Sequence, residues 1–389
     1  MKTALLAREI LTPIDRIQNG VVVFEDGCIS EVGSRDCIEI PKACRTIDLK
    51  DAILAPGFID LHIHGAAGRD VMEGDDDALE AVESLIARHG VTSYCPTTVT
   101  ASMDHTFGSL SKLGRFIERM ASFGPANNGR ARPLGVHLEG PFLAASHRGV
   151  HPPDLLQEPS IKLFHEMWTA AIGRVKVLTI APELPGALEL IHEARRRGVV
   201  VSLGHSNADL CEAKRGISAG GRHATHTFNA MRRLEHRDAG ILGAVLTNQC
   251  VTADIIVDGV HVDPTVVDLF LRAKGVDGAV LITDGTSATG MPDGTYRLGN
   301  IEVEVKDGRC TSQGKLAGSI LTLDRAVRNV MDFAGWTLQN AVRLATYNPA
   351  RVLGVEKTKG IIKSGADADF AILNSKGEVQ NTIIGGIGI

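Results

Sequence analysis

The chain has 389 residues, of which 44% are hydrophobic, and its formal net charge is −5. That length allows one large α/β barrel together with a smaller module, each with a buried core. The negative charge and the lack of a basic run argue against nucleic acid or a membrane surface as the main partner. Its seven cysteines are an odd number without a CxxC pair, which favours a reduced, cytoplasmic setting.

The first twenty residues read MKTALLAREILTPIDRIQNG, and Arg8, Glu9 and Pro13 interrupt them before any apolar core of signal-peptide length develops. No apolar run elsewhere approaches the length of a membrane span. We therefore expect neither a secretion signal nor a membrane anchor.

Both flanks of the chain read as short antiparallel strands. GVVVFEDGCISEVG predicts a hairpin around Asp26-Gly27, and ADFAILNSKGEVQNTIIGG near the other end predicts a turn at Lys376-Gly377. We expect the two flanks, residues 1–54 and 351–389, to pair into one small β-sandwich module.

Residues 55–350 alternate between apolar runs of strand length and stretches of helical periodicity such as DDALEAVESLIARHG. Several runs lack strict polar alternation, as strands buried on both faces should. Repeated βα units of this kind predict a TIM (β/α)8 barrel. A hairpin in YRLGNIEVEVKDGRC, after the eighth run, is expected to lie over the barrel mouth. The eight runs are GFIDLHI, GVTSYCP, PLGVHLE, VKVLTIA, VVVSLGH, HATHTF, VTADIIVDG and GAVLITD.

Histidines and carboxylates follow several of these runs. The carboxyl ends of the strands of a TIM barrel face its active site, so these side chains should converge there. Imidazole with carboxylate suits zinc, and also iron or manganese. The six residues are His62, His64, Glu139, His205, His226 and Asp284.

Each of the six also has a structural interpretation. A single histidine after a strand is more often a hydrogen-bonded core group than a metal ligand, and Glu139 or Asp284 alone could cap a helix. The placement of all six at one end of the barrel favours the metal site. HEMW at His165 and HEAR at His192 lack the second histidine of an HExxH helix, so they do not predict a zincin.

Stretches along nearly the whole chain resemble the amidohydrolase superfamily and, within it, the N-acetylglucosamine-6-phosphate deacetylase family. HxH and strand-end histidines are common to the superfamily, whereas HLEGPF, FNAM and DGVHVD are more specific to the deacetylases. The matching stretches occur in the family's order and are APGFIDLHIHG, GVHLEGPF, RGVHPP, SLGHSNA, THTFNAM, DGVHVD, ITDGT, LAGS and ATYNPAR.

The resemblance implies one or two divalent metal ions. A first site would use Glu139, His205 and His226 and leave a position for water, and a second would use His62 and His64 with Glu139 as the bridge. Zinc is expected, with iron, manganese or cobalt as alternatives. Superfamily members that bridge their metals with a carboxylated lysine carry it at the end of strand four. Here that position reads TIAPEL, and Lys176 lies at the opposite end of its strand.

The activity implied by the resemblance is hydrolysis of the acetamide of a phosphorylated amino sugar, which releases acetate. Asp284 would act first as general base and then as general acid. His151, together with the metal, would face the carbonyl oxygen and stabilise its developing negative charge.

The resemblance also implies the residues that hold the substrate, and a homodimer or higher homo-oligomer, because in the family the arginine at the Arg237 position reaches a neighbouring subunit's site. Arg232, Arg233 and Arg237 could instead form a solvated charge cluster. The substrate residues are Val150, His151, Asn229, Ala230, Arg237, Asp258, His261, Leu316, Ala317 and Gly318.

Two other functions are compatible with the sequence. A cyclic amidase or deaminase of the same barrel would share the HxH pair and the late aspartate, but would not need the phosphate-contacting segment. A catalytically inactive scaffold barrel would be expected to lose a ligand or the base, and none of them is missing here.

Overall fold

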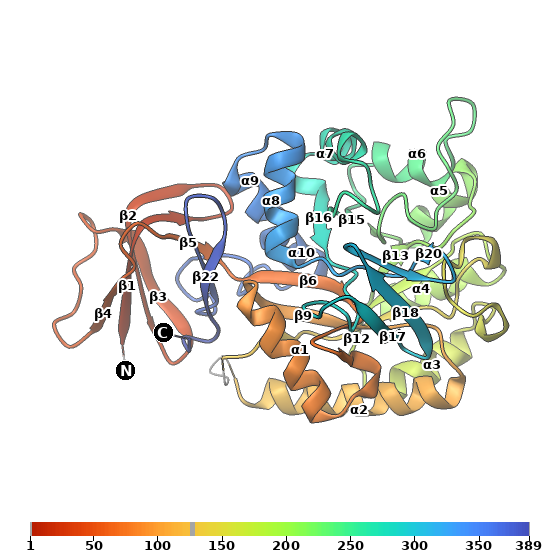
Figure 1. The fold of residues 1–389 in the computed structure, drawn as a ribbon, viewed down its shortest axis with the longest axis horizontal. Helices are drawn as coiled ribbons and strands as arrows, with labels where there is room; N and C mark the ends of the chain where they lie inside the picture. The colour runs from red at the N-terminus through yellow and green to blue at the C-terminus, as the bar shows by residue number, and fades with distance from the viewer. Residues whose placement is uncertain (1, 125–128, 389) are drawn as a thin grey trace.

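The computed structural model describes residues 2–124 and 129–388. Strands from both flanks of the chain form one sheet at one end of the molecule, with both termini close together (Figure 1). Its order is β22-β21-β5-β1-β2-β3, with β4 paired to β1. The strands are β1 (Thr3–Leu11), β2 (Arg16–Glu25), β3 (Cys28–Ser34), β4 (Arg45–Asp48), β5 (Ile53–Pro56), β21 (Phe370–Leu373) and β22 (Val379–Ile383).

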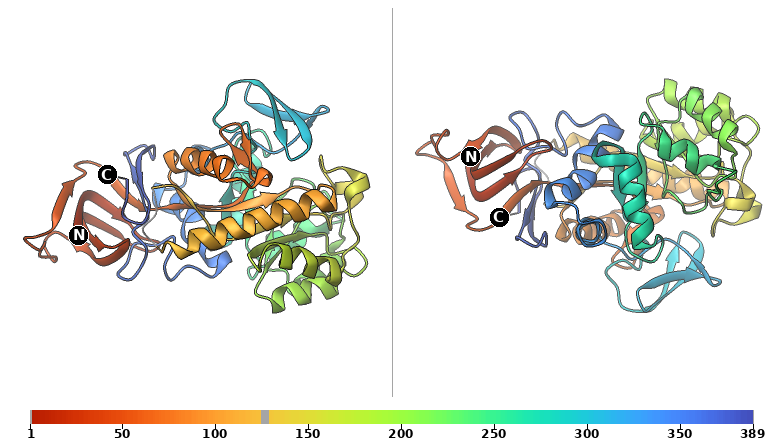
Figure 2. Two further views of the ribbon diagram at one scale, coloured as in Figure 1. Left: turned by 90° about the horizontal axis from the view of Figure 1, so that it is seen from below. Right: turned by 90° about the horizontal axis from the view of Figure 1, so that it is seen from above.

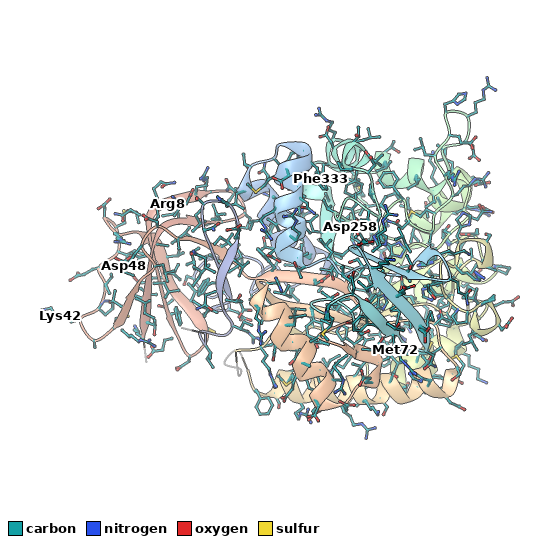
Figure 3. The ribbon with its side chains drawn as sticks, in the orientation of Figure 1. Arg8, Lys42, Asp48, Met72, Asp258 and Phe333 are labelled. Carbon is teal, nitrogen blue, oxygen red and sulfur yellow. The ribbon has the colours of Figure 1, made fainter. Side chains whose placement is uncertain are left out.

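The turn between β2 and β3 confirms the predicted hairpin, because Asp26 and Gly27 both have positive φ, at 51° and 79°. The strand β21 runs antiparallel to β5, with Phe370 opposite Pro56, and so joins the two flanks. Figure 3 labels Arg8, Lys42 and Asp48 on this terminal part, and Met72 and Asp258 on the larger part.

Eight strands of the larger part occupy the predicted apolar runs, and every residue in them is buried except Lys176 and Val200. Parallel pairing joins the first six in the order β6-β9-β11-β12-β13-β14, with the short β10 (Arg132–Pro133) beside β9, and separately joins β15 to β16. The eight are β6 (Phe58–Ile63), β9 (Val91–Thr98), β11 (Val136–Glu139), β12 (Val175–Ile180), β13 (Val200–Leu203), β14 (His223–Ala224), β15 (Ala253–Ile256) and β16 (Ala279–Ile282).

Backbone hydrogen bonds connect the two groups of strands at both junctions. Thr227 N donates to Asp254 O over 2.9 Å, and Asp284 N donates to His62 O over 2.9 Å. The arrangement is therefore barrel-like. The sixth strand is shorter than predicted: it ends at Ala224, and the chain then leaves the ladder with φ of 30° at His226 and 80° at Phe228.

Helices on the outside follow most strands, as the two further views show (Figure 2). In α1, Asp75 caps the first turn by accepting a bond from Ala78 N, and Leu79, Val82 and Ile86 form its buried face. The helices are α1 (Asp76–Arg88), α2 (Met103–Ser122), α3 (Ile161–Ala170), α4 (Ala187–Arg196), α5 (Leu210–Ala219), α6 (Gly240–Thr247), α7 (Pro264–Gly278), α8 (Leu323–Ala334), α9 (Leu338–Ala345) and α10 (Tyr347–Leu353). Among the helices that the structure describes, none has the length and apolar character needed to cross a bilayer.

The predicted hairpin after the eighth strand is a four-stranded antiparallel sheet that stands out from the barrel (Figure 2). The sequence indicated one turn, but Gly308 and Gly314 each allow a further reversal with positive φ. The strands are β17 (Gly294–Leu298), β18 (Ile301–Lys306), β19 (Arg309–Ser312) and β20 (Lys315–Leu316).

Candidate metal and active site

The six predicted ligand and base residues meet at the carboxyl ends of the barrel strands. The Glu139 carboxylate lies between two groups of histidines: Oε2 is 3.2 Å from His64 Nε2, and Oε1 is 3.0 Å from both His205 Nε2 and His226 Nε2. Asp284 Oδ1 is 3.2 Å from His64 Nε2. Glu139 therefore lies within reach of both groups of histidines.

Backbone carbonyls fix the orientation of three of these imidazoles. Nδ1 of His64 lies 3.0 Å from Thr97 O, Nδ1 of His205 lies 2.9 Å from His147 O, and Nδ1 of His226 lies 3.2 Å from Asn229 O. Because a carbonyl oxygen can only accept, each Nδ1 carries a proton and each Nε2 can present a lone pair.

Two such Nε2 atoms, those of His205 and His226, are only 3.0 Å apart. Lone pairs that face each other at this distance beside a carboxylate are stabilised by a cation between them. A carbonyl partner on the other ring nitrogen is also the usual second contact of a metal-bound histidine. The residues present therefore fit a divalent metal.

His151 differs from these histidines, although its ring also lies in the cluster. Ligand atoms of His151, Glu139 and His205 lie within 4.8 Å of one another, as do those of His62, His64 and Asp284. Thr100 N donates to His151 Nδ1 over 3.2 Å, so Nδ1 accepts, and the proton of the neutral ring sits on Nε2. That Nε2 is 3.5 Å from Glu139 Oε2. His151 is arranged as a hydrogen-bond donor, whereas His226 is arranged as a ligand.

The cluster keeps its carboxylates ionised. Burial raises the pKa of Glu139, but the neighbouring imidazoles of His62, His151 and His205 outweigh burial and bring that pKa well below its usual range. Burial likewise raises the pKa of Asp284, but the neighbouring imidazoles of His64 and His62 outweigh burial, so the net pKa lies below its usual value. A negatively charged pair of this kind attracts a cation.

Three residues of the cluster adopt left-handed backbone conformations that non-glycine residues rarely populate. The φ angles are 47° at His205, 30° at His226 and 51° at Asp284. Such strain costs of order 1–3 kcal/mol per residue and is concentrated at functional sites. Each of the three lies two residues beyond the end of its strand. The left-handed backbone there turns the chain and directs the side chain into the site.

A cavity of about 220 Å³ opens beside the cluster, and most of the predicted substrate residues line it. Ala317 is instead buried beneath its neighbours, and Asp258 lies behind His261, whose Nδ1 is 2.7 Å from Asp258 Oδ2. Gly318 has a φ of 58° and lies so close to Asp284 O that a Cβ would be 2.9 Å from it. Those in the lining are Val150, His151, Asn229, Ala230, His261, Leu316 and Gly318.

One predicted substrate residue lies apart from this cavity, and two lining residues were not predicted. Arg237 is exposed on the loop that follows Met231, and it is not among the residues that line the cavity. Leu298 and Gly149 do line it and were not predicted. In the sequence GTYRL, polar Thr295 and Arg297 alternate with apolar Tyr296 and Leu298, a pattern that favours an inward-facing Leu298. Only the fold shows that Leu298 faces the site.

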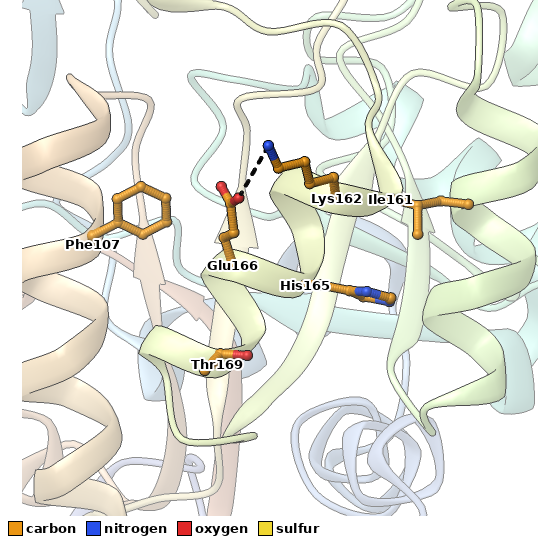
Figure 4. Close-up of a pocket in the computed structure, with 6 residues that line it drawn as sticks. All are labelled: Phe107, Ile161, Lys162, His165, Glu166 and Thr169. Atoms are coloured by element: carbon orange, nitrogen blue, oxygen red, sulfur yellow. Dashed lines mark ion pairs between the residues drawn. The ribbon is translucent and has the colours of Figure 1, made fainter.

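A separate hollow of about 730 Å³ lies elsewhere, between α2 and α3 (Figure 4). Phe107 and Ile161 contribute apolar surface, and Lys162 pairs with Glu166 over 3.9 Å. His165 is bonded to Glu193 over 2.7 Å. None of the six cluster residues lines this hollow, so its size does not make it the active site.

A barrel-like α/β fold with histidines and carboxylates that converge at its strand ends is typical of metal-dependent hydrolases. The chain belongs to the amidohydrolase family, whose model matches residues 53–387.

Its relatives within that family include deacetylases of phosphorylated amino sugars. The N-acetylglucosamine-6-phosphate deacetylase of Lysinibacillus sphaericus is 37% identical over 86% of this chain and 84% of its own. The N-acetylgalactosamine-6-phosphate deacetylase of Escherichia coli O157:H7 is 36% identical over 99% of each. A Mycobacterium smegmatis N-acetyl-D-glucosamine-6-phosphate deacetylase variant, solved in complex with N-acetyl-D-glucosamine-6-phosphate, superposes with a TM-score of 0.92 at 32% identity, over 100% of this chain and 99% of its own.

Proposed function

We propose that the protein hydrolyses the acetamide of N-acetyl-D-glucosamine 6-phosphate to D-glucosamine 6-phosphate and acetate, within amino-sugar catabolism or recycling. The observation that carries this proposal is the Glu139-centred cluster beside a cavity whose lining includes Asp284, His151 and His261. Relatives named as N-acetylglucosamine-6-phosphate deacetylases, at 33–39% identity, support the choice of substrate.

Zinc is the metal that we propose, at one or two ions per subunit. Glu139, His205 and His226 would hold the first ion, and His62 and His64 would hold a second with Glu139 shared between them. A divalent ion held by these residues would supply hydroxide at neutral pH and would polarise the carbonyl of the amide.

Asp284 and His151 would carry the proton transfer and the charge stabilisation. Asp284 is ionised and lines the cavity, so it can take a proton from the attacking water and return it to the departing amine. His151 presents a protonated Nε2, fixed by its bond from Thr100 N, and can donate to the oxygen on which negative charge develops.

The phosphate would bind at the side of the cavity formed by Asn229, Ala230 and His261. Asp258 orients His261 through its carboxylate, and it accepts further bonds from Val260 N and His261 N, both at 2.8 Å. The exposed Arg237 would complete the phosphate site of a neighbouring subunit, which makes a homodimer part of the proposal.

The corresponding galactosamine compound is a second candidate substrate, because the relative from Escherichia coli O157:H7 is named for it and matches 99% of this chain. The two sugars differ in the orientation of a single hydroxyl. A site that hydrogen-bonds that hydroxyl would separate them strongly.

Three further points belong to the same proposal. The barrel would be a closed (β/α)8 barrel of residues 55–350, and the terminal sheet a β-sandwich module of residues 1–54 and 351–389. The setting would be a reducing cytoplasm, which agrees with seven cysteines that are all free thiols.

Acetate release from both phosphorylated sugars, measured together with metal content, tests the function. We expect kcat/KM to be higher for the glucosamine compound and activity to disappear on metal removal and return with zinc. A higher kcat/KM for the galactosamine compound would reassign the substrate, and no acetate from either sugar by the zinc-loaded protein would reject the proposal.

A further inference from the structure

His137 is a buried residue of β11 that the proposed chemistry does not use. It lies two residues before Glu139 and is 1% exposed. Its Nδ1 lies 3.0 Å from Leu61 O and therefore donates to it, and its Nε2 shares a hydrogen bond of 2.8 Å with the Thr179 hydroxyl. The imidazole thus joins β11 to β6 on one side and to β12 on the other.

Further hydroxyls extend this contact across the inside of the barrel. Thr179 Oγ1 lies 2.8 Å from Thr225 Oγ1, which lies 2.5 Å from Ser202 Oγ. Apart from Thr179, each member of the network comes one to three residues before a residue of the cluster. The pairs are Leu61 and His62, His137 and Glu139, Ser202 and His205, and Thr225 and His226. The network therefore forms a polar layer directly beneath the cluster.

His62 differs from three other cluster histidines in how its ring is held. Nδ1 of His64, His205 and His226 each has a backbone carbonyl partner, but His62 Nδ1 is buried without a hydrogen-bond partner among the described residues. Its ring instead packs edge-on against the His137 ring, with centroids 4.7 Å apart and an interplanar angle of 71°.

We infer that His137 is a positioning residue that orients His62 for metal binding, by ring contact with His62 and by its hydrogen bond to the carbonyl of Leu61. This inference rests on the proposed metal site. Residues that orient metal ligands typically change metal affinity by about 10- to 100-fold when they are replaced. The effect should fall on the ion held by His62 and His64 more than on the ion held by His205 and His226.

Titration of the metal-free protein with Co²⁺, followed by visible absorption and by metal per subunit after dialysis, tests the inference. His137→Phe keeps a ring against His62 but removes both hydrogen bonds, and His137→Asn keeps a donor near Leu61 O but removes the ring. We expect wild type to bind two ions and each variant to bind the second about 10- to 100-fold more weakly, with the first changed less than threefold.

Tyr94→Phe is the matched control. It removes one buried hydrogen bond, from Tyr94 to Glu83 over 3.1 Å, at a fully buried position on the neighbouring strand β9. We expect it to lower the melting temperature without changing the affinity for either ion. The control thereby distinguishes a variant that is only less stable from a variant in which His62 is no longer oriented.

The outcomes are distinct. Unchanged affinity for the second ion in both His137 variants would overturn the inference alone, as would an equal weakening of both ions. Wild-type protein that bound only one ion, with an affinity that neither His137 variant changed, would also overturn it, since that ion would not depend on His137. Wild-type protein that bound no Co²⁺ would instead overturn the proposed metal site itself.

Discussion

Asp284 is the residue on which the proposed proton transfer depends. Replacement by asparagine keeps the size of the side chain, and Glu139, His205 and His226 still supply three ligands, so the first ion should stay bound. The amide cannot accept a proton at neutral pH, and we expect kcat to fall by about 100- to 10,000-fold. Steady-state kinetics with metal analysis of the same sample checks this, and near-normal kcat at full metal content would remove Asp284 from the mechanism.

At this scale the sequence revealed which residues form the cluster but little of how they are oriented. His62, Glu139 and Asp284 could be predicted because each lies at or just beyond the end of an apolar strand. The partners that set the tautomers could not, since His64 is bonded to Thr97 O and His205 to His147 O, on segments distant in sequence. The contacts of His137 could not be predicted for the same reason, since they join it to Leu61 and Thr179 on other strands.

Among the secondary-structure elements, α6 ends in an unusual cap. Lys274 of α7 is 2% exposed, and its Nζ donates to the carbonyls of Val245, Asn248 and Val251 over 3.0, 2.9 and 2.5 Å. A cation is favourable at the carboxyl end of a helix, and here it hydrogen-bonds the Val245 carbonyl of the last turn and two carbonyls of the segment that follows.

Lys274→Met should therefore destabilise the protein without reaching the active site. It leaves buried carbonyls unpaired, and we expect the free energy of unfolding to fall by about 1–3 kcal/mol with little change in kcat. Urea denaturation measures the loss. Lys162→Met on α3, whose side chain is 87% exposed, is the control and should change stability by less than about 0.5 kcal/mol. Equal effects of the two substitutions would contradict a capping role for Lys274.

The strands were the most predictable elements, because burial on both faces leaves long apolar runs such as VKVLTIA. The sixth was predicted too long, since the residues after Ala224 leave the ladder to place His226. The sheet from β17 to β20 was only partly predicted, because its second and third turns depend on glycines that a short sequence window does not distinguish from loop residues.

Across the whole molecule, a buried ion cluster joins the terminal sheet to the barrel. Asp369, next to β21, accepts from Arg132 of β10 over 2.9 Å, from Lys359 over 2.6 Å and from Gly385 N over 2.7 Å. Burial raises the pKa of Asp369, but the charges of Lys359 and Arg132 outweigh it, so the net pKa lies below the usual value.

A depressed carboxyl pKa stabilises the fold above the pKa of the unfolded chain, near 4, and that contribution is lost as pH falls below it. Asp369→Asn should lower the unfolding free energy by about 3–5 kcal/mol at pH 7, because it leaves buried cations without their partner. The unfolding free energy of this variant should also fall less between pH 7 and pH 3 than that of wild type. Urea denaturation between pH 3 and 7 tests both expectations. If the unfolding free energies of the two proteins changed with pH in parallel, Asp369 would be excluded as a source of the pH dependence.

The proposed dimer makes a prediction about mixed subunits. If Arg237 serves the neighbouring site, co-expressed Arg237→Ala and Asp284→Asn chains form dimers in which one of the two sites has both residues intact. About a quarter of all sites would then be complete in a random mixture. We expect kcat/KM to recover to about that fraction of wild type. Activity equal to the average of the two separate variants would show that Arg237 does not act across an interface.

The pairing of β5 with β21 has a consequence for the order in which the chain is made. Ile53 and Leu54 leave the ribosome early and pair with β1 on one side, but the residues that cover the other edge, Phe370–Leu373, are synthesised only after the entire barrel. An apolar strand edge therefore stays open during most of translation, when such edges are prone to aggregate. Ribosome-bound chains that stop before residue 370 should depend on chaperones, and completion of the last hairpin should release them.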